Sequence, residues 1–393
     1  MGSDSGDDGV GPSSPGTPPA IESLFNLLVA QIPRGYSVAM KGFSETPAGP
    51  SGSAPSTASM KSNIKDVARR AEVSIATVSR VLNDTCPVHP DKRMRVEKAI
   101  QELGYIPNPA ARSLLKRETG ALAILLPVIT GEFFSEFLTG LDTVSREEKY
   151  FAIVSASHRE EEQLRLAIRN VCRRVDGMLV MAPESSTAGL RNVIPSGLPV
   201  VYVNTTADDQ LDDVISFDNF GGARKLVSHL LELGHRRIAI INGTPKASDA
   251  IDRFRGYRQA LEGHGVKPVE SLEIPGDFTQ EAGYEGARAL LRLSDRPTAV
   301  FCVNDNMAVG ALRAFQERGV RVPEDIALGG FDDIPMANYL TPSLTTVRVP
   351  IKKIGHMSVE RLIQKTRAKE ALQPEQQVLP VELVIRGSTV AGR

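Results

Sequence analysis

Cysteine is scarce in this sequence. The 393 residues contain three cysteines, Cys86, Cys172 and Cys302, which lie far apart in the chain. Their spacing matches neither a metal site nor the dense disulfide framework of a small secreted domain. We therefore expect a cytoplasmic protein without a bound metal ion, in which the three cysteines are small buried apolar residues.

Long apolar runs are also missing. No stretch of the sequence approaches the roughly 20 apolar residues that a membrane-spanning helix needs. The apolar segment 24–30 is short, follows an acidic beginning and lacks a clear cleavage site, so it does not predict a secretory signal. With 46 Lys and Arg against 47 Asp and Glu, the formal net charge is −1. We expect no membrane partner.

Motifs of the common enzyme classes are absent as well. The sequence contains no phosphate-binding loop, nucleophile elbow or zinc motif, and no carboxylate pair spaced for acid–base catalysis. We interpret the neighbours Asp332 and Asp333 as a ligand contact and a turn support. The prediction is a protein that is not an enzyme and uses no cofactor. An enzyme is the alternative that a turnover assay on sugars would test.

Residues 1–59 differ in composition from the rest of the chain. Gly, Pro and Ser account for 28 of these 59 residues, and such a segment buries too little apolar surface to offset the entropy of folding. We predict a disordered extension of unassigned role. Because a recognisable pattern begins only at Met60, a translation start at that residue is an open alternative.

The length and the apolar content of 41% suggest two or three domains, and we expect the first at residues 60–106. Apolar residues at helical spacing predict three helices, over 64–71, 74–83 and 91–103. Ser74 is a suitable N-cap for the second helix, and Gly104 ends the third. The tight connection between the first two helices is typical of a helix-turn-helix, whose second helix enters the major groove of DNA. An ordinary pair of packed helices is the alternative.

The local charge favours DNA binding. Residues 60–117 contain twelve Lys and Arg but only six Asp and Glu, a net charge of +6. A concentrated excess of positive charge is what contact with DNA phosphates requires. We therefore expect this part of the chain to bind double-stranded DNA.

The residues that follow make the pattern more specific. Residues 74–83 (Ser-Ile-Ala-Thr-Val-Ser-Arg-Val-Leu-Asn), 103–108 (Leu-Gly-Tyr-Ile-Pro-Asn) and 108–115 (Asn-Pro-Ala-Ala-Arg-Ser-Leu-Leu) resemble the headpiece and hinge of the lac/gal repressor (LacI/GalR) family. One departure is at 89–91, where His-Pro-Asp replaces the common Ser-Pro-Glu and predicts a weaker cap for the third helix.

The resemblance implies that residues 107–119 contain a hinge helix that forms only on operator DNA. Leu114 would then insert between central base pairs from the minor groove, an established way to kink a duplex. Asn108 as N-cap and Pro109 at the first helical position agree with a helix too short to persist alone. The predicted DNA-binding residues are Ser74, Ile75, Ala76, Thr77, Ser79, Arg80 and Asn83 in the headpiece, and Asn108, Ala111, Arg112 and Leu114 in the hinge.

From residue 120 onward, strand and helix patterns alternate, which implies parallel sheets covered by helices on both faces. Residues 120–387 resemble the regulatory core of the same family, itself similar to periplasmic sugar-binding proteins. The predicted fold class is α/β: an N-terminal helix-turn-helix headpiece with a hinge helix, followed by a two-subdomain periplasmic-binding-protein-like (type I) core over 120–393. The resemblance implies three crossovers between the subdomains, near 217–219, 345–349 and 382–387.

The family binds its effector between the two subdomains, and open α/β sheets place ligands at the carboxyl ends of their strands. The resemblance assigns Arg253 to hold two ligand oxygens with its planar fork and Asp332 to accept ligand hydroxyls or amines. The implied effector-binding residues are Phe133, Phe134, Asn204, Phe217, Arg253, Asn304 and Asp332. Taken singly, Asp332 can be a turn residue, Arg253 a surface ion pair and the phenylalanines core. The loop 127–131 departs from the family pattern, so the sugar's identity stays open.

The predicted function is a sequence-specific transcriptional regulator, a repressor, whose operator binding is controlled by a small-molecule effector, with a sugar expected. The expected partners are a pseudo-palindromic operator with a central CpG step, the effector and a second copy of the chain. Only six residues follow Gly387, too few for a tetramer-forming leucine-heptad tail, so we expect a homodimer that uses helices 133–148 and 353–365. Alternatives are a phosphosugar or nucleobase effector, an activating role, and a solute-binding protein without a gene-regulatory role. The target genes and the direction of the ligand response stay open.

Overall fold

The structure is a computed structural model that describes residues 62–83, 86–105, 118–156, 160–207 and 212–390. All helices and strands described below belong to one unit that begins at Asn63. The predicted extension over 1–59 and the hinge positions 107–117 lie outside the described residues. None of the helices in the described ranges combines the length and the apolar character that a membrane span needs.

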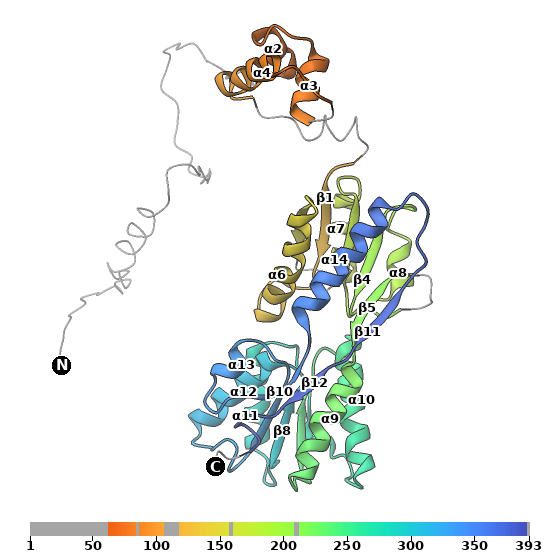
Figure 1. The fold of residues 1–393 in the computed structure, drawn as a ribbon. Coiled ribbons are helices and arrows are strands. Elements are labelled where there is room, and N and C mark those ends of the chain that lie inside the picture. The colour runs from red at the N-terminus through yellow and green to blue at the C-terminus, as the bar shows by residue number, and fades with distance from the viewer. Residues whose placement is uncertain (1–61, 84–85, 106–117, 157–159, 208–211, 391–393) are drawn as a thin grey trace, which may run out of the picture. The chain divides into compact units, whose positions relative to one another are not determined.

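Three short helices form the headpiece (Figure 1): α2 (Ile64–Arg70), α3 (Ile75–Asn83) and α4 (Pro90–Leu103). Their apolar faces meet around Val67, Val78 and Val96, which are fully buried. The Oγ of Ser74 accepts a 3.2 Å hydrogen bond from the amide of Thr77, as an N-cap should. Gly104 ends α4 in the left-handed conformation, with φ 54°. The predicted three helices are therefore confirmed, and α4 begins with no side-chain cap, as the residues before it predicted.

The first subdomain of the core contains a sheet in the order β11-β5-β4-β3-β1-β2, with every neighbouring pair parallel. Its strands are β1 (Ala121–Leu125), β2 (Phe151–Ser155), β3 (Gly177–Met181), β4 (Val200–Val203), β5 (Val214–Phe217) and β11 (Gln376–Leu379). Its helices are α6 (Glu132–Glu147), α7 (Glu161–Val171), α8 (Thr187–Arg191) and α14 (Ile351–Arg367). This is the alternating arrangement that the sequence predicted.

The second subdomain contains a sheet in the order β12-β10-β9-β8-β6-β7. Its strands are β6 (Ile238–Ile241), β7 (Glu273–Ile274), β8 (Ala299–Cys302), β9 (Ala327–Asp332), β10 (Thr345–Arg348) and β12 (Glu382–Val384). Its helices are α9 (Asn219–Glu232), α10 (Ser248–Gly263), α11 (Gln280–Leu291), α12 (Asp305–Glu317), α13 (Met336–Tyr339) and the 3-10 turn η1 (Glu270–Leu272). The prediction of parallel pairing was wrong for β12, which runs antiparallel to β10 because the chain enters it from the other subdomain.

The chain passes between the subdomains three times, close to the predicted places. The first passage follows β5 at residues 217–219, as predicted. The predicted range 345–349 is mostly strand β10, and the passage lies after it, at Val349 and Pro350. The third passage lies at Pro380 and Val381, before the predicted range 382–387. The two shifts arise because strand pairing continues into residues that the sequence alone suggested were connections.

Both faces of the first sheet are covered, which explains the uninterrupted apolar run of β1. Leu122 and Ile124 pack toward Phe137 on one side, whereas Ala123 and Leu125 pack toward Leu164 on the other. Alternate residues of a strand point to opposite faces, so a strand buried on both sides needs apolar residues throughout. The packing of strands between helix layers therefore follows from the sequence.

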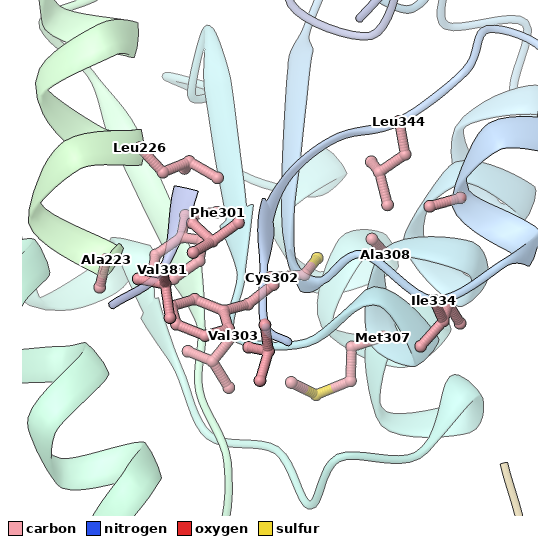
Figure 2. Packing of buried hydrophobic residues seen from close by; sticks show 14 of the residues in the cluster. Ala223, Leu226, Phe301, Cys302, Val303, Met307, Ala308, Ile334, Leu344 and Val381 are labelled. Carbon is pink, nitrogen blue, oxygen red and sulfur yellow. The ribbon is translucent and has the colours of Figure 1, made fainter. Parts of the chain in front are cut away.

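The second sheet packs in the same way (Figure 2). Phe301, Cys302 and Val303 lie near Leu226 of α9 and Met307 of α12 in a continuous apolar core. Cys302 is fully buried, as predicted. The same expectation was wrong for Cys86, which is exposed in the segment before α4, and Cys172 is only partly buried.

Helices α6 and α14, which the sequence suggested as dimer helices, pack against each other through glycines. A Cβ on Gly140 would lie 2.1 Å from the carbonyl oxygen of Lys352, and one on Gly355 would lie 2.3 Å from that of Phe137. The two backbones are so close that larger residues do not fit. This contact fixes the α6 terminus that carries Phe133 and Phe134.

Candidate functional site

A cavity of about 320 Å³ lies between the two subdomains, at the carboxyl ends of strands from both sheets. Pockets for small molecules usually enclose roughly 300–1,000 Å³, so this one suits a single small ligand. All seven residues predicted from the sequence line it: Phe133, Phe134, Asn204, Phe217, Arg253, Asn304 and Asp332. The loop that departs from the family pattern contributes Pro127, Val128, Thr130 and Gly131.

Arg253 is held firmly on the inner face of α10. Its Nε donates a 2.9 Å hydrogen bond to Asn219 Oδ1, one terminal nitrogen donates to the carbonyl oxygen of Val303, and the other lies 3.4 Å from Asp332 Oδ1. The guanidinium carbon lies 3.8 Å from the centre of the Phe331 ring. The side chain is only 3% exposed, so the alternative of a surface ion pair was wrong. Arg253 is an ordered, paired charge.

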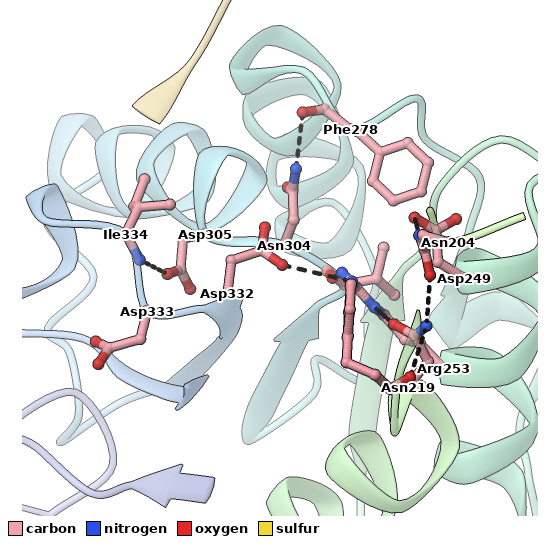
Figure 3. A network of polar contacts seen from close by, with 12 residues as sticks. Asn204, Asn219, Asp249, Arg253, Phe278, Asn304, Asp305, Asp332, Asp333 and Ile334 are labelled. Atoms are coloured by element: carbon pink, nitrogen blue, oxygen red, sulfur yellow. Dashed lines mark hydrogen bonds and ion pairs between the residues drawn. The ribbon is translucent and has the colours of Figure 1, made fainter. Parts of the chain in front are cut away.

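Amide side chains continue this network across the cleft (Figure 3). Asn219 Nδ2 donates a 3.2 Å hydrogen bond to Asn204 Oδ1, and Asn204 Nδ2 donates a 3.3 Å hydrogen bond to Asp249 Oδ2. Asn204 follows β4 in the first subdomain, whereas Asp249 lies in the first turn of α10 in the second. Each donor faces an acceptor: Arg253 donates to Asp332 on one side, and on the other side the donation runs through the amides of Asn219 and Asn204 to Asp249. The network joins the two subdomains.

Burial shifts the acidic groups of the cleft toward their protonated forms. Burial raises the pKa of Asp332 to about 7, and the opposing effect of Arg253 is smaller. The pKa of Asp249 is also raised by burial, while Arg253 lowers it. Such perturbed carboxyl groups that line a cavity are typical of functional sites.

Asp305 lies behind the cavity and supports the loop that carries Asp332. Its carboxylate accepts a 2.6 Å hydrogen bond from Thr346 Oγ1 of β10 and a 2.9 Å hydrogen bond from the amide of Ile334. The pKa of Asp305 is raised well above its ordinary value, mainly by burial and to a smaller extent by the negative charge of Asp332. A Cβ on Gly330 would lie 2.2 Å from the carboxylate, so this position accepts only glycine. Asp305 therefore connects the cleft to the strand that precedes a crossover.

Aromatic rings form the apolar side of the cavity. Phe133 lies edge-on to Phe134 with ring centres 5.3 Å apart, and 6.5 Å from the ring centre of Phe217. Phe278 faces the cavity from the loop before α11, where a Cβ on Gly243 would lie 2.3 Å from its ring. Rings arranged around one space can cover the C–H face of a sugar or stack on the ring of a base.

Three cavity residues have left-handed backbone conformations, with φ 48° at Asn204, 69° at Phe278 and 114° at Asp332. Asparagine and aspartate tolerate this region, but a bulky residue such as phenylalanine rarely adopts it. Strained conformations of this kind persist where the surrounding structure holds them, and they gather at binding sites. The backbone thus aims these three side chains into the cavity.

Sequence reasoning missed several polar residues of the site: Asn219, Asp249 and Asp305. The predicted helix 255–263 began too late, since α10 begins at Ser248. With the correct start, Asp249 lies one helical turn before Arg253 and shares its face, a signal that the sequence does contain. Asp305 directly follows the predicted Asn304, but only its partners Thr346 and Ile334 reveal its role.

The headpiece presents part of its predicted DNA-binding set to solvent. Ile75 is 44% exposed, and Ser74, Ala76 and Arg80 are also exposed at the surface of α3. By contrast, Asn83 Nδ2 donates a 2.9 Å hydrogen bond to the carbonyl oxygen of Ser79, so this amide is bonded within the helix. The other predicted residues of the headpiece, Thr77 and Ser79, are partly buried. The hinge residues Asn108, Ala111, Arg112 and Leu114 lie outside the described residues.

Comparison with protein families matches both parts of the chain. Residues 63–108 match the bacterial regulatory proteins of the lacI family, and residues 227–389 match the periplasmic binding protein-like domain. The repressor CytR of Escherichia coli (strain K12) is 34% identical over 333 residues, which cover 84% of this chain and 96% of CytR. The repressor PurR of Vibrio atlanticus is 35% identical over 310 residues, 78% of this chain and 92% of PurR. The chain belongs to the lacI family of bacterial regulatory proteins.

Solved structures agree with this assignment. A lac repressor dimer bound to operator and the anti-inducer ONPF is similar with a TM-score of 0.74 and 30% identity, over 84% of this chain and 99% of that one. A complex of the transcriptional regulator CelR with cellobiose is similar with a TM-score of 0.63 and 31% identity, over 83% and 99%. The predicted fold class and the resemblance to the lac/gal repressor family are therefore confirmed.

Proposed function

We propose that this family member represses transcription by binding a pseudo-palindromic operator as a homodimer, and that a small uncharged ligand in the cleft controls that binding. The observation that carries the proposal is the cavity between the subdomains, where an ordered arginine, amides and carboxylates lie opposite aromatic rings. A polar network on one side and rings on the other suit a sugar, or a nucleobase with its sugar. The expectation of a sugar effector is kept, with a nucleobase as the alternative.

Operator binding is assigned to α3 and to the hinge. The exposed Ile75, Ala76 and Arg80 supply apolar contacts and a guanidinium to base edges in the major groove. Leu114 is proposed to wedge into a central CpG step once the hinge helix forms on DNA. A similar solved structure is that of a lac repressor dimer bound to operator, which supports operator binding by this chain. Two such headpieces require an operator with twofold symmetry.

The homodimer is supported by exposed apolar side chains on an edge strand. Phe151 is 70% exposed and Val154 is 38% exposed on β2, the last strand of the first sheet. An uncovered edge with large apolar residues favours contact with another chain. The lac repressor relative is a dimer in its complex. We place β2, together with α6, at the interface.

The remaining expectations belong to the same proposal. A regulator that binds the chromosome acts in the cytoplasm, without a membrane partner and without catalysis. The relatives are transcriptional repressors, which supports a role other than that of an enzyme. Within the described residues, no group of three or more His, Cys, Asp or Glu side chains is placed to hold a metal ion.

The test begins with an operator selected from random duplexes by the purified full-length chain. The affinity of the chain for this operator is then measured by fluorescence anisotropy in the presence of free sugars, phosphosugars, nucleosides and nucleobases. We expect a twofold-symmetric site with a central CpG step, and at least one unphosphorylated compound that changes the affinity tenfold or more. Arg253→Ala should abolish the ligand effect, and Arg255→Ala should keep it because that side chain is exposed on the same helix and pairs with Asp252.

Two outcomes would contradict the proposal. A chain that binds ligands but no specific duplex would be a solute-binding protein. A chain that binds a specific duplex with an affinity that no compound alters would lack the effector control that we assign to the cleft. Because Arg253→Ala removes a buried charge, its thermal unfolding is compared with that of the unmodified chain, and Asp332→Asn serves as the milder second variant.

A further inference from the structure

The charges that face the cavity are unevenly distributed. Among the described residues that line it, Asp249, Asp332 and Glu184 are acidic, whereas Arg253 is the one Lys or Arg. A ligand in this space therefore meets more carboxyl groups than cations. Even when burial keeps a proton on Asp249 or Asp332, the described residues that line the cavity offer no unpaired positive charge to an anionic group of a ligand.

The positive charge of Arg253 is already occupied by the protein. Three of its N–H groups point to Asn219, Val303 and Asp332, and the guanidinium stacks on the Phe331 ring. A guanidinium has about five N–H donors, so those that remain can bond a hydroxyl oxygen of a ligand. A phosphate would have to compete with Asp332 for the guanidinium of Arg253. Asp332 has the advantage because the fold already holds it beside that group.

Asp249 has spare capacity to accept hydrogen bonds. One carboxylate oxygen accepts 2.8 Å from the amide of Ala250, and the other accepts a long 3.3 Å bond from Asn204 Nδ2. A carboxylate offers about four lone-pair positions, so acceptor positions are left over. The residue lines the cavity, where a hydroxyl or amino group of a ligand could donate to it. An anionic group at the same place has no proton to donate, and it would be repelled whenever the carboxyl group of Asp249 is ionised.

We propose that Asp249 is a specificity-determining residue of the cleft, which accepts hydrogen bonds from an uncharged polyhydroxyl ligand and excludes the phosphate ester of the same compound. Asp249 and Asp332 are the two terminal acceptors of the hydrogen-bond network that runs through Arg253 and the amide side chains (Figure 3). The proposed ligand lies between these two carboxyl groups. This inference rests on the proposed function in one respect, namely that the ligand occupies this cleft.

The experiment compares matched pairs of compounds on the full-length chain by isothermal titration calorimetry. The pairs are D-ribose and ribose 5-phosphate, D-glucose and glucose 6-phosphate, cellobiose and cellobiose phosphate, and adenosine and cytidine with their 5′-monophosphates. We expect at least one unphosphorylated member to bind, and its phosphate ester to bind at least tenfold more weakly. Asp249→Asn keeps the shape and one acceptor oxygen but removes the charge. This variant should bind the unphosphorylated compound at least tenfold more weakly. The ratio of the affinity for that compound to the affinity for its phosphate ester should fall.

The matched control is Asp252→Asn, on the same helix. The Asp252 side chain is 42% exposed and pairs with Arg255, so this variant should leave both affinities unchanged. The ratio between the two affinities is the decisive readout, because general loosening of the fold would weaken both compounds alike. Thermal unfolding of both variants checks that they are folded.

Three results would overturn the inference: an ester that binds more tightly than its parent compound, a ratio that Asp249→Asn leaves unchanged, or no binding by any unphosphorylated member. Operator affinity is measured separately on the same samples. A compound that shows the expected ratio but leaves operator binding unaltered supports the role of Asp249 and contradicts the proposed function. The two ideas can therefore fail independently.

Discussion

Arg253 and Asp332 form a buried ion pair in the cleft, with a nitrogen–oxygen distance of 3.4 Å, although burying such a pair is costly. Removing two charges from water is repaid only when the geometry is good and the remaining donors are bonded. Here Asn219 and Val303 take the other donors of the guanidinium, and Phe331 covers its face. A buried ion pair adds little net stability, so its placement beside a cavity is better explained by ligand binding.

The raised pKa of Asp332 predicts a pH effect on stability. Its pKa is about 7 in the folded chain against an ordinary value of 3.8, so the folded state binds a proton more tightly than the unfolded state between these values. Its contribution to stability is complete below about pH 4 and is lost as the pH rises through 7. The groups that face it are Arg253 and Asp249 from α10 and Asp305 from α12.

Asp332→Asn should therefore flatten the pH profile. Relative to the variant, the unmodified chain should lose unfolding free energy from pH 4 to 7, by at most about 1.4 kcal/mol per pH unit. Urea unfolding at a series of pH values measures this. The control is Asp325→Asn, because hydrogen bonds from Arg321 lower the pKa of Asp325 to about 2 and outweigh the opposing effect of burial. Asp325→Asn should change the pH dependence of the unfolding free energy only below pH 4. If the profiles of Asp332→Asn and of the unmodified chain run parallel from pH 4 to 7, the prediction is refuted.

Arg80 gives a second prediction for a single residue. Arg80→Ala should reduce the ratio of specific to non-specific operator affinity by roughly 10-fold to 100-fold, since a good guanidinium contact to a base contributes about 1–3 kcal/mol of discrimination. Anisotropy at one fixed salt concentration measures both affinities. Arg69→Ala on α2 is the matched control, with a side chain that is 81% exposed and pairs with Asp66. If Arg80→Ala keeps the full sequence preference, Arg80 has no role in base recognition.

At the scale of secondary-structure elements, the two edge strands of the first sheet, β2 and β11, differ in the helices that lie beside them. Both edges expose large apolar side chains, Phe151 on β2 and Val378 on β11. Only β2 is adjacent to α6, whose glycine contact with α14 makes that side of the subdomain rigid. A rigid apolar edge loses little entropy when a second chain covers it.

Phe151→Glu should convert the dimer into monomers at micromolar concentration, because it places a charge in the proposed interface. Sedimentation velocity measures the change. Val378→Glu introduces the same charge at the opposite edge, where the side chain is 67% exposed, and should leave the dimer intact. Equal dissociation by both variants, or by neither, would remove β2 from the interface.

At the scale of the whole molecule, the two subdomains are joined across the cleft by more than the three passages of the chain. The amide of Ser248 donates a 2.9 Å hydrogen bond to the carbonyl oxygen of Pro183, and the amide of Met336 donates a 2.7 Å hydrogen bond to Glu132. A ligand that fits the cavity adds further contacts between the same two bodies. Occupancy of the cleft can therefore change the balance between their relative positions.

Thermodynamic linkage makes the proposed control testable in both directions. If a compound weakens operator affinity by a given factor, the operator complex must bind that compound more weakly by the same factor. Titration of the compound into the free chain and into its operator complex measures this. Leu114→Ala should weaken specific binding much more than non-specific binding and should reduce the linkage. Unequal factors, or a linkage that persists unchanged in Leu114→Ala, would contradict coupling through the hinge.

The sequence by itself determined the order and type of most elements, since helical and strand spacing are local properties that each segment expresses alone. Its resemblance to the lac/gal repressor family also identified all seven predicted cleft residues. Four of them, Asn204, Phe217, Asn304 and Asp332, lie at the carboxyl ends of strands, which must meet at one edge of a sheet. The residues Asn219, Asp249 and Asp305 were decided only by the tertiary structure. Their hydrogen-bond partners come from distant strands and helices, and no local pattern specifies which distant amide a carboxylate will meet. The same reason applies to the antiparallel β12 and to two of the three passages, whose positions depend on which subdomain offers the better strand pairing.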